Sequence, residues 1–187
     1  MTADEYLRRV SRGMAGMDRR VRDDVLRELK SHLVDAAREQ GEAQALASAE
    51  SPEAVAARYK EMYGYGRTYV AMFAAIAAAL AVPTLPLLLY GGSGLLAFAA
   101  TLVFLLALVA YLMAVAVKAG STAGLFAGLA SCVSRFASLA VLMAVGSAEV
   151  RDASGWVLFT FVSVLLIAIG FLPGRAKEKW RRRDVGL

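Results

Sequence analysis

The sequence predicts an all-α fold in which a small cytoplasmic three-helix head is followed by a four-helix transmembrane bundle. Two observations lead to this prediction. The chain is 58% hydrophobic with a mean hydropathy of +0.53, which is too apolar for a soluble domain of 187 residues. Its charges are unevenly placed, because residues 1–67 hold 12 of the 21 basic and 12 of the 16 acidic side chains. The net charge of +5 therefore arises in residues 68–187, where it indicates membrane topology rather than nucleic-acid binding.

The chain is expected to divide into a head at residues 1–67, a membrane domain at 68–174 and a basic tail at 175–187. The first apolar stretch begins near residue 69, behind the polar head, so we expect an uncleaved membrane anchor rather than a signal peptide. Cys132 is the single cysteine, which excludes an internal disulfide.

The first helix of the head is predicted from "TADEYLRRVSRGM", which opens with a capping box. Thr2 can cap the start of the helix while Glu5 reaches back to it. Leu7, Val10 and Met14 then fall on one helical face, which we assign to the core.

The second helix is predicted from "DRRVRDDVLRELKSHLVDAAREQG". Asp18 is the expected N-cap and Gly41 the expected stop. Apolar residues at helical spacing form a stripe that should face the core. The stripe consists of Val21, Val25, Leu29, Leu33 and Ala36.

The last helix of the head is predicted from "SPEAVAARYKEMY", with Ser51 as its cap and Pro52 at its first position. A short helical turn around "EAQALASA" links it to the second helix. The core of so small a bundle is thin, so contact with the membrane, a partner or another copy would add to its stability.

The stretch "VLRELKSHLVDAAREQGEAQALASAESPEAVAARY" resembles the HAAS domain, a short helical module at the cytoplasmic N-terminus of small bacterial and archaeal membrane proteins. The shared features are Glu-Leu-x-x-His-Leu beginning at Glu28, an Ala-rich short helix, and a Pro-initiated last helix with "PEAVA". The family usually has Leu-Gly-Asp-Pro where this chain has "SAESP". The resemblance covers about residues 3–63. It implies a membrane-tethered signalling or regulatory protein, often encoded beside a PadR-type winged-helix repressor, and it does not imply catalysis.

Charged side chains of the second helix share a face beside the apolar stripe. Glu28, His32 and Asp35 lie at successive helical offsets, and Glu39 follows one turn later. A metal site would normally need three or four strong ligands, and the chain has no second histidine. We therefore expect no metal and no cofactor, and we interpret Glu28, His32 and Asp35 as a surface for a protein partner.

Four stretches are long enough to cross a hydrocarbon core about 30 Å thick. They cover about residues 69–90, 95–117, 122–146 and 156–172. Basic residues flank them mostly on the side of the head, whereas the opposite loops contain only Arg151, with Glu149 and Asp152. The positive-inside rule then places both termini in the cytoplasm, and we expect the protein in the inner membrane.

Prolines and glycines mark two features of the spans. Pro83 and Pro86 should kink the first span, either for gating or as an ordinary feature of membrane helices. Gly120, Gly124 and Gly128 recur every four residues, a spacing that lets two helices approach closely. The approach can join two helices of one chain, which we favour, or two chains in a homo-oligomer.

Arg135 is the best candidate for a polar site inside the membrane. It lies about 20 Å from either end of the third span, and a charge at this depth costs roughly 2.5–3.5 kcal/mol by insertion scales. No span contains Asp or Glu. The possible partners include freed carbonyls near Pro83, a lipid phosphate, another protein, or a hydroxyl. The candidate hydroxyls belong to Ser131, Ser134, Thr101, Tyr111, Thr160 and Ser163.

The tail "RAKEKWRRR" carries six basic residues against one acidic residue directly after the fourth span. We expect it to contact anionic lipid headgroups, to enforce topology, or both. The six basic residues are Arg175, Lys177, Lys179, Arg181, Arg182 and Arg183.

No catalytic triad, phosphate-binding loop, metalloprotease motif or pair of intramembrane acids is found in the sequence, so an enzyme is not expected. The favoured hypothesis is a signalling or regulatory adaptor that binds a protein at the cytoplasmic face, with no direct nucleic-acid contact. The alternative is a small transporter or channel subunit that uses Arg135.

Overall fold

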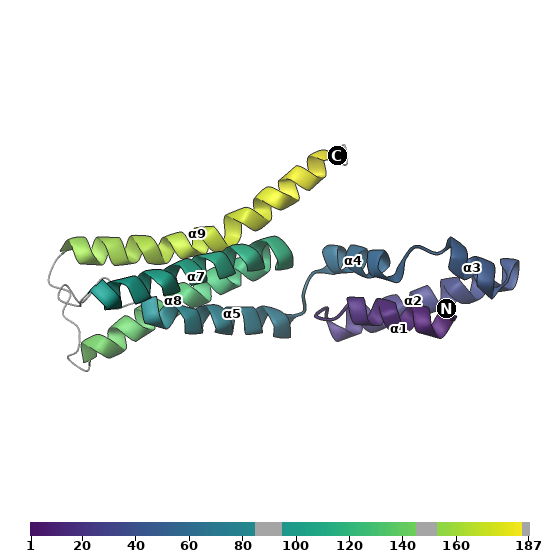
Figure 1. The fold of residues 1–187 in the computed structure, drawn as a ribbon, viewed down its shortest axis with the longest axis horizontal. Coiled ribbons are helices and arrows are strands. Elements are labelled where there is room, and N and C mark those ends of the chain that lie inside the picture. The colour runs from purple at the N-terminus through teal and green to yellow at the C-terminus, as the bar shows by residue number, and fades with distance from the viewer. Residues whose placement is uncertain (85–94, 145–152, 185–187) are drawn as a thin grey trace. The chain divides into compact units, whose positions relative to one another are not determined.

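The computed structural model describes residues 1–84, 95–144 and 153–184, and every element in these residues is helical (Figure 1). The predicted all-α class is confirmed. The chain divides into two compact units, residues 1–69 and residues 70–187. The break lies two residues after the boundary expected from the sequence.

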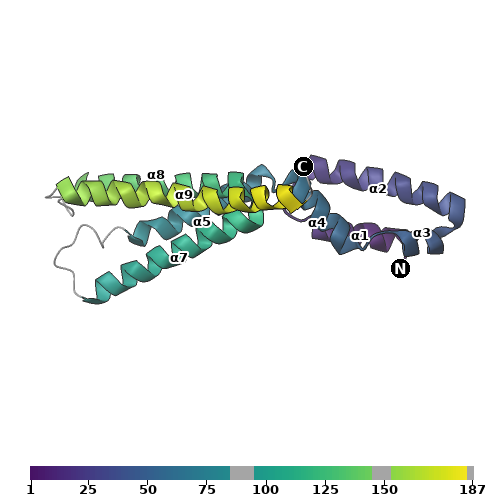
Figure 2. The ribbon, with the colours of Figure 1, turned by 90° about the horizontal axis from the view of Figure 1, so that it is seen from above.

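The head contains α1 (Ala3–Gly13), α2 (Arg19–Gln40), α3 (Glu42–Ser48) and α4 (Pro52–Tyr63) (Figure 2). Three expected caps are confirmed. The side chain of Thr2 accepts a hydrogen bond from the backbone N–H of Glu5 at 3.3 Å, and Asp18 accepts one from Arg20 at 3.0 Å. Ser51 accepts one from Ala54 at 3.3 Å. The predicted linking turn is the seven-residue helix α3.

The core of the head lies where α1, α2 and α4 meet. Among the described residues, α2 fully buries Val25, while the rest of its apolar stripe is partly buried. Gly13 allows α1 and α4 to approach closely, since a Cβ at Gly13 would lie 2.6 Å from the Cβ of Ala56. The buried core residues are Tyr6, Val10, Met14, Met17, Val25, Val55 and Ala56.

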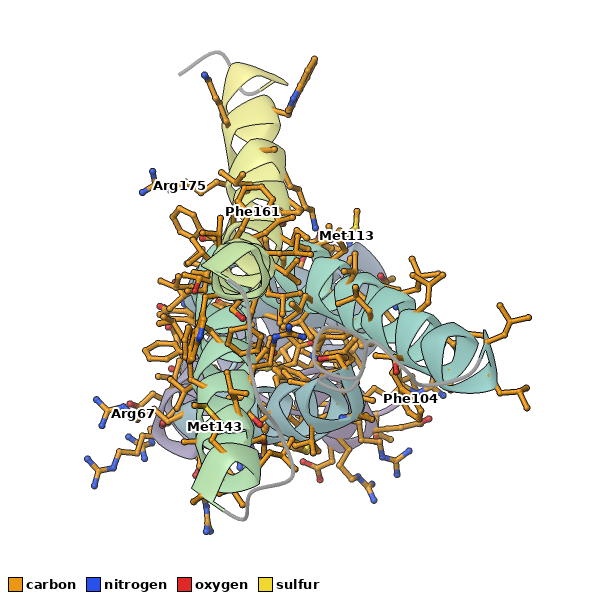
Figure 3. The ribbon with its side chains drawn as sticks, turned by 90° about the vertical axis from the view of Figure 1, so that its left-hand side faces the viewer. Arg67, Phe104, Met113, Met143, Phe161 and Arg175 are labelled. Atoms are coloured by element: carbon orange, nitrogen blue, oxygen red, sulfur yellow. The ribbon has the colours of Figure 1, made fainter. Side chains whose placement is uncertain are left out.

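Among its described residues, the second unit contains four helices that are long and apolar enough to cross a membrane. They are α5 (Arg67–Ala81), which is followed by the 3₁₀ turn η1 (Val82–Thr84), α7 (Leu95–Ala119), α8 (Ser121–Ala144) and α9 (Ala153–Asp184). Large apolar side chains lie exposed on these helices, among them Met113, Met143 and Phe161 (Figure 3). In the absence of a soluble partner such a surface suits lipid.

Pro83 lies at the described end of the first span. The α-helical geometry of α5 stops at Ala81, and Pro83 lies in the 3₁₀ turn that follows, so the first span changes geometry where a kink was expected. Pro86 and Tyr90 lie outside the described residues, as does Gly146 at the expected end of the third span.

Helix α9 runs on beyond the expected fourth span. It includes Pro173 and continues through the basic segment to Asp184, so the tail expected after Leu172 is helical in its described part. Figure 1 shows α9 changing direction near the start of its yellow part. A proline within a helix removes a backbone donor and is a common cause of such a bend.

Candidate functional site

Arg135 lies on α8 in the interior of the second unit, where its side chain is 1% exposed. Its Nε donates a hydrogen bond to Ser163 Oγ of α9 at 3.0 Å, and its Nη1 donates one to Thr84 Oγ1 of η1. The guanidinium carbon lies 5.0 Å from the centre of the Phe159 ring. Arg135 therefore links α8 to α9 and to the turn that ends the first span.

The two hydroxyl groups that accept hydrogen bonds from Arg135 each donate a hydrogen bond to a backbone carbonyl. Ser163 Oγ donates to the carbonyl of Phe159 at 2.7 Å, and Thr84 Oγ1 donates to the carbonyl of Ala81 at 2.6 Å. Ser163 thus donates within α9, whereas Thr84 of η1 donates to the last residue of α5. Arg135 Nη2 is buried and has no hydrogen-bond partner in the part of the chain that the structure describes.

Sequence reasoning found one of these two hydroxyls. Ser163 was among the expected partners, whereas Thr84 was not. Ser131 and Ser134 instead donate to the carbonyls of Ala127 at 2.9 Å and Ala78 at 2.8 Å. Tyr111 OH donates to the carbonyl of Phe73 at 3.2 Å. The sequence feature that could have pointed to Thr84 is its position directly after Pro83, because the α-helix ends there and the next side chain can turn toward the bundle interior.

The glycine row divides between a turn and a helix contact. Gly124 lies in direct backbone contact with Gly170 of α9, and a Cβ at Gly128 would lie 2.9 Å from the Cα of Ile167. A Cβ added at Gly120 would have no neighbouring atom within 4 Å. The φ of Gly120 is 95°, and the residue lies in the turn between α7 and α8. The close approach seen here is within one chain. Gly170, which sequence reasoning missed, belongs to the same contact.

The charged face of α2 is open to solvent. Glu28, His32 and Asp35 are all exposed, and His32 Nε2 lies 3.8 Å from Glu28 Oε1. Asp35 Oδ1 lies 3.8 Å from Arg38 Nη1. No group of three or more possible metal ligands occurs among the residues with described positions. These side chains thus share a face and form a mainly acidic surface with no enclosed site.

A groove of about 340 Å³ lies between α1, α2 and α3 on the head. Its floor is apolar and its rim is charged, with acids on α1 and α3 and bases on α2. Val34, which is 43% exposed, lies off the predicted stripe and was not singled out from the sequence. The lining residues at the centre of the groove are Leu7, Leu33, Val34, Ala37 and Leu46.

The basic segment of α9 is partly engaged with the helices around it. Lys177 Nζ donates to the carbonyl of Val117 at 3.1 Å, near the C-terminus of α7, where a cation favours the helix dipole. The guanidinium carbon of Arg175 lies 4.9 Å from the centre of the Phe171 ring. Lys179 and Trp180 are exposed. The side chains of Arg181, Arg182 and Arg183 lie outside the described part.

The helices of the head and their order along the chain invite comparison with known families. Residues 5–58 match the HAAS family model. The resemblance predicted from the sequence is thereby confirmed for the head, and the four apolar helices that follow fit a membrane protein that carries a HAAS domain. Comparison with the curated proteins and with the solved structures gives no match.

The structure explains why the HAAS domain of this chain does without the usual turn glycine. The segment "SAESP" joins α3 to α4, and Ala49 and Ser51 have φ values of −70° and −58°. Glu50, between them, stands where the family has its glycine, and no non-glycine residue in the described part of the chain has a positive φ. The turn therefore needs no left-handed position. The departure from the family pattern therefore does not disturb the fold.

Proposed function

We propose that this protein is a multi-pass membrane protein of regulatory function, without catalysis, whose HAAS domain binds a protein partner at the cytoplasmic face. The observation that carries the proposal is the pairing of a small HAAS head with four apolar helices in one chain. The tether confines the head to a surface, so its search for a partner that also visits the membrane takes place in two dimensions.

The partner surface in this proposal is the exposed face of α2. Asp24, Glu28, Asp35 and Glu39 recur along this face at helical spacing, with His32 between them. Because the face is mainly acidic and exposed, it suits a partner that presents basic side chains. Charge complementarity of this kind raises the association rate and selects among partners.

Orientation in the proposal follows from the basic residues. Four crossings put both termini on one side, and the positive-inside rule makes that side the cytoplasm of the inner membrane. Arg175 and Lys179, followed in sequence by the Arg181–Arg183 run, would contact anionic headgroups, each contributing about 1 kcal/mol near the surface. Trp180, which is 67% exposed, suits the membrane interface.

The proposal is tested with the full-length chain, tagged and extracted from its native membranes in mild detergent. The double variant Glu28→Lys/Asp35→Lys reverses the charge of the α2 face, and Glu61→Lys serves as a control in the last turn of α4. We expect a near-stoichiometric protein to co-purify with the unmodified chain and with the control, and to be lost from the double variant.

Thermal unfolding of the three purified chains accompanies the test, so that loss of the partner is not mistaken for loss of the head. The proposal fails if the double variant retains every partner that the unmodified chain retains. It also fails if no protein co-purifies at a near-stoichiometric level with the unmodified chain.

The burial of Arg135 favours a second candidate, a small transporter or channel subunit. The two candidates make opposite predictions for Arg135→Leu. An adaptor that works through its head should keep its partner and its function with this substitution. A transporter that works through Arg135 should lose flux, which is measured in vesicles that contain the purified protein.

A further inference from the structure

We propose that Arg135 holds a small inorganic anion, of which chloride is the simplest example, inside the membrane unit. The site would be formed by the guanidinium of Arg135, with Nη2 as the donor. Ser163 and Thr84 would fix the orientation of the guanidinium. This inference goes beyond the proposed function, because it concerns the second unit and requires no protein partner.

The first step is the charge balance around Arg135. The described residues of α5, η1, α7 and α8 contain no Asp or Glu, and in α9 the first acid is Glu178, about 22 Å of helix beyond Ser163. Glu149 and Asp152 follow the end of α8 at Ala144, which is itself about 14 Å of helix beyond Arg135. A carboxylate from the described helices therefore does not reach the guanidinium.

The second step is the supply of donors and acceptors. A guanidinium has five N–H donors and stays charged in proteins. Nε and Nη1 donate to Ser163 and Thr84, but these hydroxyls are neutral and use their own protons on carbonyls. Both N–H groups of Nη2 remain, on an atom that is buried and without a partner among the described residues. A buried charge with unused donors is costly unless an opposite charge joins it.

The third step is the size of the anion. Arg135 is 1% exposed, and Ser163, Thr84 and the ring of Phe159 contact the guanidinium. Its Cα lies about 21 Å of helix from Ser121 at one end of α8 and about 14 Å from Ala144 at the other. A lipid phosphate, or a side chain of a partner protein, would have to reach a guanidinium that is 1% exposed while remaining attached to a larger molecule outside the bundle. A small free anion also has to enter this interior, but it is the smallest of the three occupants and needs no attachment to the surface.

The experiment uses the purified full-length protein in detergent and measures its thermal unfolding through tryptophan fluorescence. Sodium chloride replaces sodium gluconate at constant ionic strength, with overnight equilibration so that a buried site can exchange. A ligand at a hundredfold excess over its Kd should raise the Tm by about 5–10 °C for a chain of this size.

Arg135→Gln should remove the chloride-dependent rise, whereas Arg175→Gln should retain it. Arg175 is the matched control because it also packs on a phenylalanine ring but is exposed. The inference is overturned if the unmodified protein has the same Tm in chloride and gluconate. It is equally overturned if Arg135→Gln keeps the full rise, because the effect of chloride then lies elsewhere.

A direct measurement keeps the test valid if Arg135→Gln does not fold. Equilibrium dialysis of the unmodified protein against radioactive chloride should give one bound chloride per chain. Arg135→Lys, which keeps the charge but loses the planar fork, should bind chloride at least tenfold more weakly. Absence of binding to the unmodified protein overturns the inference whatever the variants do.

Discussion

At the scale of the residue, two buried serines with the same local bond differ in one contact. Ser131 and Ser163 are both 0% exposed, and each donates to the carbonyl four residues earlier in its own helix. Only Ser163 also accepts a hydrogen bond from Arg135. A comparison of the two serines therefore measures how much the hydrogen bond from Arg135 to Ser163 contributes to stability.

We predict that Ser163→Ala destabilises the protein more than Ser131→Ala does. Ser163→Ala removes the hydroxyl that accepts from Arg135 Nε, so this buried N–H loses its hydrogen bond. A hydrogen bond to a charged group contributes about 1.5–3 kcal/mol to stability. For a chain of this size, this corresponds to a difference in Tm of roughly 3–12 °C, measured by thermal unfolding in detergent. Equal losses from the two substitutions would show that Ser163 does not stabilise Arg135.

A second prediction at this scale concerns pH and Tyr6 in the head. Burial, together with the nearby carboxylates of Glu50 and Glu53, raises the pKa of Tyr6 above its usual 10.0. Its OH donates to the carbonyl of Glu50 at 2.9 Å, and only the protonated form can do so. The stability that Tyr6 contributes is thus fully present below pH 10 and is lost as pH rises through the raised pKa.

Thermal unfolding of the head, followed between pH 8 and pH 11, measures this effect. The unmodified chain should lose more stability above pH 10 than Tyr6→Phe, which lacks the titrating group and starts about 1 kcal/mol lower. The difference between the two chains removes the contribution of other groups that titrate in this range. Parallel pH profiles would contradict the prediction.

The sequence indicates single residues better than it indicates their partners. Arg135 stands out as one charge in a long apolar run, and this contrast needs no structure. Thr84 does not stand out, because its position depends on the 3₁₀ turn at Pro83 and on the rotation of α8 relative to that turn. Both are outcomes of packing between helices distant in sequence. Val34 and the groove beside it were missed for the same reason.

At the scale of the element, the closest helix contact in the second unit joins α8 and α9. Gly124 and Gly170 meet backbone to backbone, and a Cβ at Gly174 would lie 2.6 Å from the backbone N of Ser121. The helices therefore run antiparallel with their small residues in register. Such contacts replace the hydrophobic attraction that lipid cannot provide between helices.

Gly124→Ala should weaken this contact, because its new methyl group would overlap the backbone at Gly170. Overpacking of this kind costs about 1–3 kcal/mol, or roughly 2–12 °C in Tm for a chain of this size. Ala137→Val adds volume at an exposed position of α8 and serves as the control. The prediction fails if Gly124→Ala unfolds at the same temperature as the unmodified protein and the control.

Helix ends in the head could be predicted because their causes are local. The side chains of Thr2, Asp18 and Ser51 accept hydrogen bonds from backbone N–H groups two or three residues later. The sequence pattern that predicts each cap and the hydrogen bond that forms it therefore lie in the same short stretch. Gly120 shows the limit of local spacing. It continues the four-residue row in sequence, yet it occupies the turn that precedes α8, because its positive φ ends one helix before the next begins.

The length of α9 illustrates the same limit at the other end of the chain. The sequence suggested a span that ends near Leu172, since Pro173 and the basic residues follow. Pro173 instead lies inside one continuous helix, and Gly174 beside it packs against the start of α8. A membrane helix tolerates proline where its neighbours supply packing and polar partners.

At the scale of the whole molecule, the distribution of charge predicts the orientation of the chain. If the four apolar helices all cross the membrane, as we propose, the head and the end of α9 are expected on the same side, which is also the side where the sequence gathers most of its basic residues. Lys118 at the end of α7 and Arg175 and Lys177 on α9 flank the spans there, whereas the sequence between α8 and α9 contains only one basic residue, Arg151. The positive-inside rule therefore predicts that this is the cytoplasmic side.

Cysteine labelling measures this orientation in a Cys132→Ser background. A membrane-impermeant maleimide added to intact cells should label Ser93→Cys, which follows the first span in the sequence and lies outside the described residues. It should not label Gln44→Cys, which is exposed on α3 of the HAAS domain, until the cells are permeabilised. The opposite pattern would place the head outside the cell. A regulatory role at the cytoplasmic face would then be excluded together with the orientation, because the acidic face of α2 could not meet a cytoplasmic partner.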